Sequence, residues 1–209
     1  MSAAGGPGTG AAGHDPTALP RDLPRPQDDG AADHLPGAPV PHVVLVDTDG
    51  QRVDLAGLPG RSVVYAYPRT GRPGQPPLAD DWDLIPGARG CTPQACDFRD
   101  HHAELTALGA RVFGLSTQDS AYQAEAVERL HLPFALLSDK QLELATALRL
   151  PTFTAAGHRL LRRLTLLVRD GRIEHVWYPV FPPDTHAAEV VAWLAGHPGE
   201  PAAAVPDGP

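Results

Sequence analysis

The feature that most constrains the fold is a series of short apolar runs that alternate with stretches of helical periodicity. The run 63–67 (VVYAY), bounded by Gly60 and Pro68, is typical of a buried central strand. Similar patterns predict strands over 43–46, 111–116, 134–137, 164–168 and 173–178, and helices over 93–108, 119–130, 139–150 and 185–194. Strands separated by helices of this length indicate an α/β domain with helices on both faces of the sheet. The hairpin expected over 164–178 makes that central sheet mixed.

The two ends of the chain differ from its middle in composition. Residues 1–39 hold fourteen Gly or Pro and little apolar periodicity, so they cannot bury enough surface to offset the entropy lost on ordering. We therefore predict disordered tails over 1–38 and 198–209, and a single domain over 39–197. Within the domain, a Pro/Gly-rich insertion over 69–90 holds one large aromatic residue, Trp82, which would either cover a site or anchor the loop.

Charge and hydropathy exclude several classes of protein. The formal net charge is −8 and the sequence has no basic run, which argues against sequence-independent binding of nucleic acid. No stretch approaches the roughly 20 apolar residues of a membrane span, and the N-terminus lacks the pattern of a secretory signal. We expect a cytoplasmic protein that binds neither nucleic acid nor membrane. The bias toward Ala, Gly, Pro and Arg, with no Asn, indicates a G+C-rich bacterial source.

Cys91 and Cys96 are the only cysteines in the sequence, and cytosolic chains use such residues for catalysis or metal binding more often than for structure. Thr92 and Pro93 are predicted to be the N-cap and first position of a helix. In a helix, five residues rise about 7.5 Å, whereas cysteines with Cα atoms more than about 7 Å apart cannot be bridged without backbone movement. The pair therefore suits a disulfide that forms only when the helix start unwinds.

The chemistry expected of the two thiols differs. The macrodipole and free N–H groups at a helix start favour an anion, so Cys91 is the candidate nucleophile. Cys96 is the candidate resolving thiol, because a sulfenic acid condenses readily with a second thiol. The alternatives are inert buried thiols, a zinc site with His101 and His102, and a reductase of protein disulfides. Adjacent histidines on one helix do not easily face one ion, and such reductases favour two residues between their cysteines.

The segment Gly90–Asp100 (GCTPQACDFRD) resembles the active-site segment of the peroxiredoxin Q group, also called the bacterioferritin comigratory protein group. The resemblance extends from about Pro39 to His197. It includes, in the same order along the chain, the stretches 47–60, 64–68, 113–116, 132–139 and 163–171. It implies a thioredoxin-like fold and a thiol peroxidase that needs no cofactor and no metal.

The resemblance also implies roles for individual residues. Cys91 would be the peroxidatic cysteine, which reduces hydrogen peroxide or an organic hydroperoxide. Cys96 would resolve the sulfenic acid as an intramolecular disulfide, and thioredoxin or a similar dithiol would reduce that bond. Arg163 would stabilise the thiolate and polarise the peroxide. Such a pair works in a monomer or in a dimer. The alternative function is a peroxide sensor or redox-regulated binding protein on the same fold, with little turnover.

The sequence departs from the family pattern just before the active-site segment. The usual Pro and Thr, seven and three residues before the peroxidatic cysteine, are Leu84 and Ala88 here. If the insertion loops out, Pro68 would occupy the Pro position and Thr70 would supply the hydroxyl that holds the peroxide. Arg89 is a further candidate for positive charge near the thiolate, and its alternative is a solvated loop residue.

Overall fold

The computed structural model describes residues 16–199, so residues 1–15 and 200–209 of the predicted tails lie outside the described part. A seven-stranded sheet has the order β2-β1-β5-β4-β3-β8-β9. Its strands are β1 (Val44–Asp47), β2 (Arg52–Asp54), β3 (Arg61–Ala66), β4 (Ala110–Ser116), β5 (Leu136–Ser138), β8 (Leu164–Arg169) and β9 (Arg172–Trp177). The β3–β4 and β4–β5 pairs are parallel and the other pairs are antiparallel. The central sheet is therefore mixed, as predicted.

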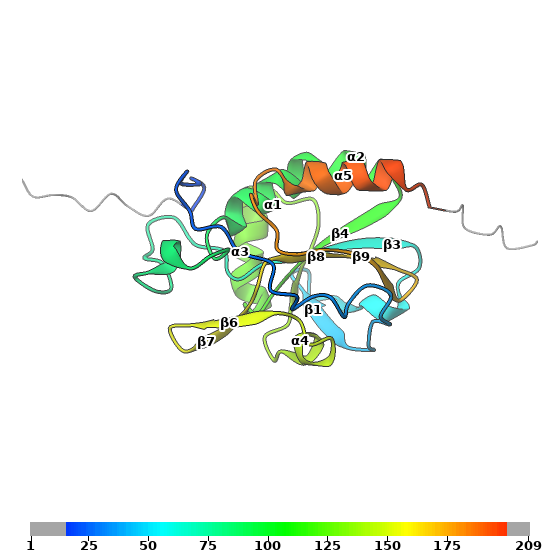
Figure 1. Cartoon of the computed structure of the whole chain (residues 1–209), viewed down its shortest axis with the longest axis horizontal. Helices are drawn as coiled ribbons and strands as arrows, with labels where there is room; N and C mark the ends of the chain where they lie inside the picture. Colours follow the sequence, from blue (N-terminus) through cyan, green and yellow to red (C-terminus); the bar gives the residue numbers. More distant parts are fainter. Residues whose placement is uncertain (1–15, 200–209) are drawn as a thin grey trace, which may run out of the picture.

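Helices cover both faces of this sheet, with α2 and α5 on one side and α4 on the other (Figure 1). The helices are α1 (Cys91–Asp100), α2 (His102–Ala107), α3 (Ser120–Leu130), α4 (Glu143–Ala147) and α5 (His186–Gly196). Two 3-10 helices, η1 (Leu55–Gly57) and η2 (Trp82–Leu84), and a separate hairpin of β6 (Thr152–Ala155) and β7 (His158–Leu161) complete the domain. Between residues 16 and 199, no helix has the length and apolar character needed to cross a membrane.

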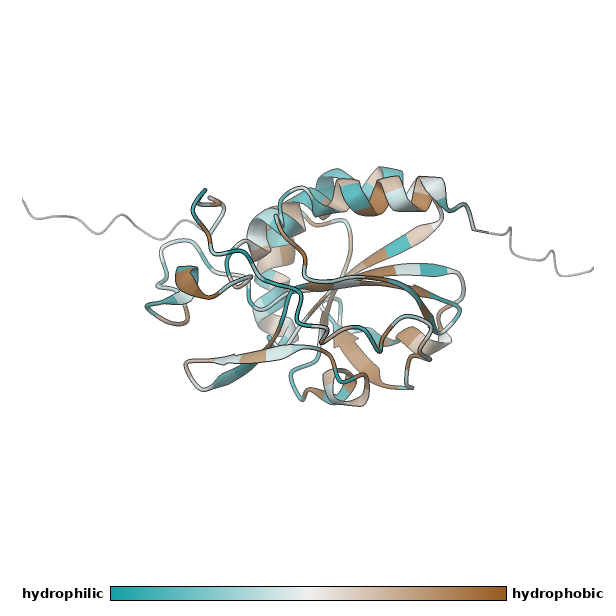
Figure 2. Cartoon of the chain, in the orientation of Figure 1, coloured by the Kyte–Doolittle hydropathy of each residue, from teal (hydrophilic) through white to brown (hydrophobic). Residues whose placement is uncertain are grey.

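The alternation of side chains along β3 separates two hydrophobic cores. Val63 and Tyr65 belong to the core beneath α1, α2, α3 and α5, whereas Val64 and Ala66 belong to the core that includes α4 and residues 32–40. All six residues of β3 are buried, which fits a central strand covered on both faces. Figure 2 shows apolar residues concentrated along the central strands, while the helices above them alternate polar and apolar residues. The predicted fold class is confirmed.

The helix predicted over 93–108 is interrupted. The chain forms α1 and α2, which meet at His101, and α1 begins already at Cys91. Gly90 is the N-cap residue, so the prediction of Thr92 as the cap is wrong. The cause is the left-handed backbone of Gly90, which turns the chain into the helix before Thr92 is reached.

The helix predicted over 139–150 is shorter than expected and is limited to α4. Asp139 nevertheless contributes to the start of this helix, because its carboxylate accepts hydrogen bonds from the N–H groups of Leu144 and Ala145 (3.2 and 2.8 Å). The β6–β7 hairpin that follows α4 was not predicted. Its sequence has no strict alternation, and its packing depends on the distant insertion.

The segment 16–38 has no regular helix or strand but is packed, so the predicted disordered tail is wrong in this part of the chain. Leu35 is fully buried, and Ala32 is buried in the same core. The N–H groups of Gly37 and Val40 donate to carbonyls of the β8–β9 hairpin (2.8 Å each). A few apolar side chains and these hydrogen bonds are enough to order a Gly/Pro-rich stretch that composition alone assigns to disorder.

The insertion over 69–90 packs against the β6–β7 hairpin. Trp82 of η2 is buried, and its ring centroid lies 6.3 Å from that of Phe153 in β6. Ala88 and Leu160 belong to the same small third core. Trp82 therefore anchors the insertion, which brings the chain back to the start of α1.

Candidate active site

Cys91 is the first residue of α1, and Gly90 holds it there. Gly90 has a φ of 101°, in the left-handed region that favours glycine. A Cβ atom at this position would lie 2.5 Å from Pro183 Cγ and 2.9 Å from Leu19 Cδ1, so there is no room for a side chain either. The turn places Cys91 in the first turn of α1, where free backbone N–H groups and the helix dipole favour an anion.

Arg163 contacts the Cys91 sulfur directly. Its Nη2 atom lies 3.1 Å from Sγ, and the residue is only 3% exposed. The same nitrogen lies 3.1 to 3.3 Å from the carbonyl oxygens of residues 87–89. Its Nη1 atom donates to the side-chain oxygen of Gln94 in α1. Arg163 therefore holds both the sulfur and the backbone that leads to it.

The positive charge of Arg163 has one candidate counter-ion. Within residues 16–199, no carboxylate contacts this guanidinium, and its partners are carbonyl and amide oxygens and the Cys91 sulfur. A buried charge is costly unless it is paired. The sulfur is the contacting group that can carry a negative charge, so Cys91 is the candidate partner of this guanidinium.

A cavity of about 260 Å³ opens beside Cys91. Thr70, Arg89 and Cys91, which the sequence placed in the site, line this cavity together. Pro68 does not line it. The Pro68 carbonyl accepts a hydrogen bond from the Ser116 hydroxyl at the end of β4 (3.1 Å), which fixes the start of the loop that carries Thr70.

The hydroxyl of Thr70 is already engaged. The side-chain oxygen of Gln118 accepts hydrogen bonds from the backbone N–H and the hydroxyl of Thr70 (2.9 and 3.1 Å). The Gln118 amide donates in turn to the Thr70 carbonyl (3.2 Å). A hydroxyl has a single proton, so this arrangement takes the Thr70 donor away from the sulfur and from a bound peroxide. It gives no support to the role that the sequence suggested for Thr70.

A second hydroxyl in the cavity belongs to Thr92. This residue lines the cavity and is 1% exposed, yet its Oγ1 atom makes no hydrogen bond to any of the described residues. Buried polar atoms without partners are uncommon in folded proteins and call for an explanation such as a ligand or a catalytic role. Sequence reasoning missed Thr92 because a Thr before a Pro at a helix start is usually a cap. The signal available in the sequence was Gly90, because glycine also occurs at the N-cap position. A cap at Gly90 would leave the Thr92 hydroxyl without a capping role.

Arg89 is buried, so its interpretation as a solvated loop residue is wrong. Its Nη1 atom lies 3.3 Å from the Asp83 carboxylate, and its Nη2 atom donates to the Ala18 carbonyl (3.0 Å). These contacts join the insertion to the N-terminal segment and hold a guanidinium group in the cavity wall.

Cys96 lines a different hollow from Cys91. It is half-buried and borders a groove with Thr17, Leu19 and Asp100, and both cysteines are free thiols. Burial raises the pKa of the Cys96 thiol, and the nearby Arg99 guanidinium offsets this only in part. Cys96 is therefore a protonated thiol at neutral pH, and a bond to Cys91 requires the start of α1 to change shape.

The histidines that follow the cysteines have other partners. His101 Nδ1 lies 3.2 Å from Asp97 Oδ1. Within the described chain, no three His, Cys, Asp or Glu side chains are grouped so that they could hold a metal ion. The zinc alternative therefore finds no support in the site geometry.

Comparison with known proteins places this chain in a family. The family model for Redoxin matches residues 35–192. The chain is 31% identical over 159 residues to the chloroplastic peroxiredoxin Q of Oryza sativa subsp. japonica, an overlap of 76% of this chain and 65% of the relative. It is 32% identical over 162 residues to peroxiredoxin Bcp of Escherichia coli (strain K12), an overlap of 75% of this chain and 93% of the relative. The solved structure of peroxidoxin BcpB from Mycobacterium tuberculosis matches with a TM-score of 0.65 at 26% identity, over 79% of this chain and 100% of that chain. The chain therefore belongs to the peroxiredoxin family, in the group of peroxiredoxin Q and Bcp.

Proposed function

We propose that this chain reduces peroxides with the Cys91 thiolate as the nucleophile. The sulfur attacks the terminal oxygen of R–O–OH, so that an S–O bond forms as the O–O bond breaks. The departing alkoxide or hydroxide takes up a proton and leaves as an alcohol or water. Cys91 is oxidised by two electrons to a sulfenic acid, and the peroxide is reduced by the same two electrons.

One observation carries this proposal: Arg163 Nη2 lies 3.1 Å from Cys91 Sγ in a buried setting, and no carboxylate of the described residues competes for the charge. A hydrogen bond to a charged group contributes about 2 kcal/mol. During the attack, negative charge moves from the sulfur to the leaving oxygen. A guanidinium fixed by Gln94 and the carbonyls of residues 87–89 can stabilise both positions without reorganising.

Thr92 is the hydroxyl that best fits the position left open by Ala88. Its buried Oγ1 atom lines the same cavity as Cys91 and is free to donate, whereas the Thr70 hydroxyl donates to Gln118. We therefore expect Thr92→Val to slow Cys91 oxidation by about tenfold, the loss of one hydrogen bond in the transition state. Thr70→Val is the matched control and should have a smaller effect. If Thr70→Val slowed Cys91 oxidation more than Thr92→Val, the role would belong to Thr70.

Resolution of the sulfenic acid follows from the position of the second thiol. The first turn of α1 unwinds, Cys96 sulfur attacks Cys91 sulfur, and the hydroxyl of the sulfenic acid leaves as water. The raised pKa of Cys96 keeps this thiol unreactive until it is released from its half-buried position. The two sulfurs cannot form a bond while α1 is intact, so unwinding must precede this step.

The test is stopped-flow mixing of the reduced protein with hydrogen peroxide, followed by mass spectrometry of the product. We expect rapid loss of one thiol and then a linkage between Cys91 and Cys96. Cys91→Ser should abolish peroxide consumption, and Cys96→Ser should allow one round of reduction that stops at the sulfenic acid. Unchanged turnover in Cys91→Ser would refute the proposal.

The partners and setting of the reaction stay predictions. A coupled assay with thioredoxin tests the expected reductant, because it requires exchange at the Cys91–Cys96 disulfide. The expected cytoplasmic location and the monomeric or dimeric state do not affect the chemistry of the site.

A further inference from the structure

We infer that the cavity beside Cys91 selects organic hydroperoxides that carry a negative charge, such as a carboxylate, and that Arg69 and Arg72 recognise this charge. This inference rests on the proposed peroxidase function and adds a substrate class to it. It is carried by the size of the cavity, the charges that line it and the way the two arginines are held.

The cavity is larger than hydrogen peroxide requires. Its volume is about 260 Å³, whereas one water molecule in the liquid takes up about 30 Å³. Cavities for drug-sized ligands begin at about 300 Å³. Pro77, Leu78 and Trp82 supply an apolar part of the wall. The space therefore suits a small organic hydroperoxide, with its reacting oxygens at Cys91 and its carbon skeleton toward the insertion.

The charged residues of the cavity wall are all of one sign. Arg69, Arg72 and Arg89 line the cavity, and no Asp or Glu of the described chain is among its lining residues. Two carboxylates outside the lining contact these arginines. Asp83 contacts Arg89 (3.3 Å), and Glu125 contacts both Arg72 (3.5 Å) and Arg129 of α3 (2.6 Å). Positive charge is therefore in excess around the cavity, which favours an anionic ligand.

Arg69 and Arg72 are held in place by an aromatic ring. Their guanidinium carbons lie 4.7 and 4.1 Å from the centroid of the Tyr122 ring on α3, within cation–π range. Among the described residues, Arg69 has no ion pair or side-chain hydrogen bond. The Nε atom of Arg72 is the atom that faces the Glu125 carboxylate at 3.5 Å, whereas its Nη atoms make no hydrogen bond to the described residues. Arg69 therefore keeps all of its donors for a ligand in the cavity, and Arg72 keeps its Nη donors.

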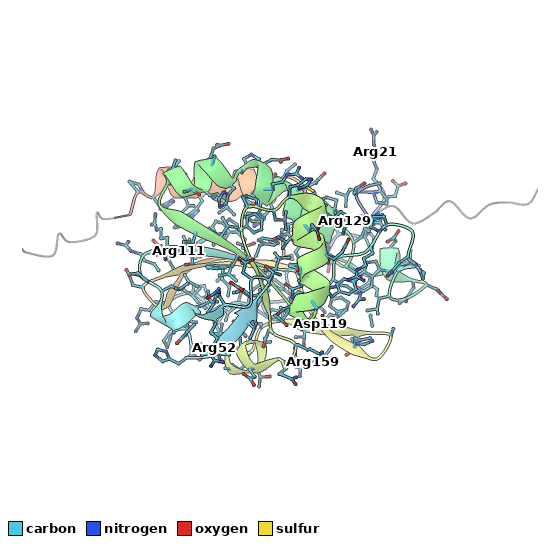
Figure 3. The ribbon with its side chains drawn as sticks, turned by 180° about the vertical axis from the view of Figure 1, so that it is seen from behind. Arg21, Arg52, Arg111, Asp119, Arg129 and Arg159 are labelled. Carbon is cyan, nitrogen blue, oxygen red and sulfur yellow. The ribbon has the colours of Figure 1, made fainter. Side chains whose placement is uncertain are left out.

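The loop between them is also fixed from the outside. Arg129 projects from α3 (Figure 3), and its Nη2 atom donates to the Gly71 carbonyl (3.1 Å). On the other side, Gln118 binds Thr70 through three hydrogen bonds. The arginine pair thus sits on a backbone that is held at both ends, which lowers the entropy lost when a ligand binds.

The experiment is a competition between cumene hydroperoxide and its para-carboxylated analogue, with dithiothreitol as the reductant. Both compounds are present in one reaction, and chromatography measures how fast each is consumed. We expect the wild-type protein to consume the carboxylated compound about tenfold faster, the effect of one charge-assisted hydrogen bond. The preference should decrease as salt is added, because salt screens the attraction.

The double variant Arg69→Gln/Arg72→Gln should bring the ratio of the two rates close to one. Arg52→Gln, which removes the same type of charge from β2 outside the cavity lining (Figure 3), should keep the wild-type ratio. If the double variant fails to fold, Arg69→Gln alone should still lower the ratio, because within the described chain this guanidinium is held by the Tyr122 ring and not by an ion pair. Equal consumption of the two compounds by the wild type, or an unchanged ratio in a folded Arg69→Gln protein, would overturn the inference. Consumption of neither compound would instead refute the peroxidase function itself.

Discussion

Replacing Arg163 with Met tests the electrostatic argument on which the proposed reaction depends. Methionine keeps an unbranched apolar side chain in the buried site but removes the guanidinium that lies 3.1 Å from Cys91 Sγ. We expect Cys91 to react more slowly with iodoacetamide at neutral pH. The reason is that the sulfur loses the guanidinium that contacts it, and a nearby cation makes a thiol more reactive.

The expected size of the effect follows from the geometry. Two fixed unit charges 3.1 Å apart attract by about 5 kcal/mol at an effective dielectric constant of about 20. The effective contribution is smaller, because the two protons of Nη2 are shared between the sulfur and the carbonyls of residues 87–89. About 2 kcal/mol remains for a hydrogen bond to a charged group, or about thirtyfold in the rate of alkylation. Reduction of hydrogen peroxide should fall further, by at least about 100-fold, because the leaving oxygen also loses a donor.

The assay measures the rate of Cys91 alkylation at neutral pH in a Cys96→Ser background, so that only one thiol reacts. Arg162→Met is the matched control, since this neighbouring arginine makes no contact with Cys91 among the described residues, and it should leave the rate unchanged. Arg163→Lys keeps the charge but not the planar guanidinium, and its rate should lie between those of the two Met variants. A folded Arg163→Met protein that is alkylated as fast as the Arg162→Met control would refute the reasoning.

Three further predictions concern the surroundings of the site. Cys96→Ser should leave the first oxidation of Cys91 unchanged and block disulfide formation, as measured by thiol titration after one equivalent of peroxide; continued cycling with thioredoxin would contradict the assigned role. Gly90→Ala should lower the free energy of unfolding by more than about 1 kcal/mol, because a left-handed backbone and a 2.5 Å contact with Pro183 both oppose a side chain; an unchanged midpoint in urea would contradict this. Burial lowers the pKa of His186 below the ordinary 6.5, so the unfolded chain binds the extra proton first. The stability that neutral His186 contributes is therefore present above that ordinary value and is lost as the pH falls toward the folded pKa. His186→Gln should flatten this part of the profile of unfolding free energy against pH, and an identical slope would contradict the assignment.

The parts of the fold that could be predicted are those set by local pattern. The run 63–67 could be assigned to a central strand because a strand with both faces covered needs an uninterrupted apolar sequence. Cys91 and Cys96 could be proposed as site residues because they lie in one short, recognisable segment, whereas Arg163 followed only from the family resemblance. The structure brings Arg163 to 3.1 Å from the Cys91 sulfur across 72 residues of sequence.

The parts that could not be predicted depend on contacts between distant segments. The Thr70 hydroxyl is unavailable to a ligand because it donates to Gln118, which lies 48 residues further along the chain. The burial of Arg89 depends on the carbonyl of Ala18, 71 residues earlier, in a stretch that composition assigns to disorder. Neither contact leaves a periodic or compositional signal. The free hydroxyl of Thr92 is visible only once the conformation of Gly90 is known.

In the proposed mechanism, the contacts that Arg163 makes at Cys91 also oppose the unwinding that resolution requires. Arg163 binds the carbonyls of residues 87–89 and the side chain of Gln94, and so fixes the turn on both sides of the sulfur. We expect oxidation to weaken this arrangement, because a sulfenic acid lacks the negative charge of a thiolate and would leave the buried guanidinium without a counter-ion. The proposed reaction would then favour the conformational change that follows it.

This coupling predicts how tightly the segment 87–96 is held in each state of Cys91. Cys91→Ser places a neutral group beside Arg163, as a sulfenic acid does, whereas Cys91→Asp restores an anion. We expect hydrogen exchange of backbone amides over 87–96 to be faster in Cys91→Ser than in the reduced wild type, with Cys91→Asp nearer to the wild type, while α5 exchanges alike in all three. If the charge at this position governs the unwinding, the two variants must differ, since they share the loss of the sulfur and differ in charge. Equal exchange in Cys91→Ser and Cys91→Asp would show that Arg163 holds the turn through the carbonyls alone, and that oxidation does not loosen it.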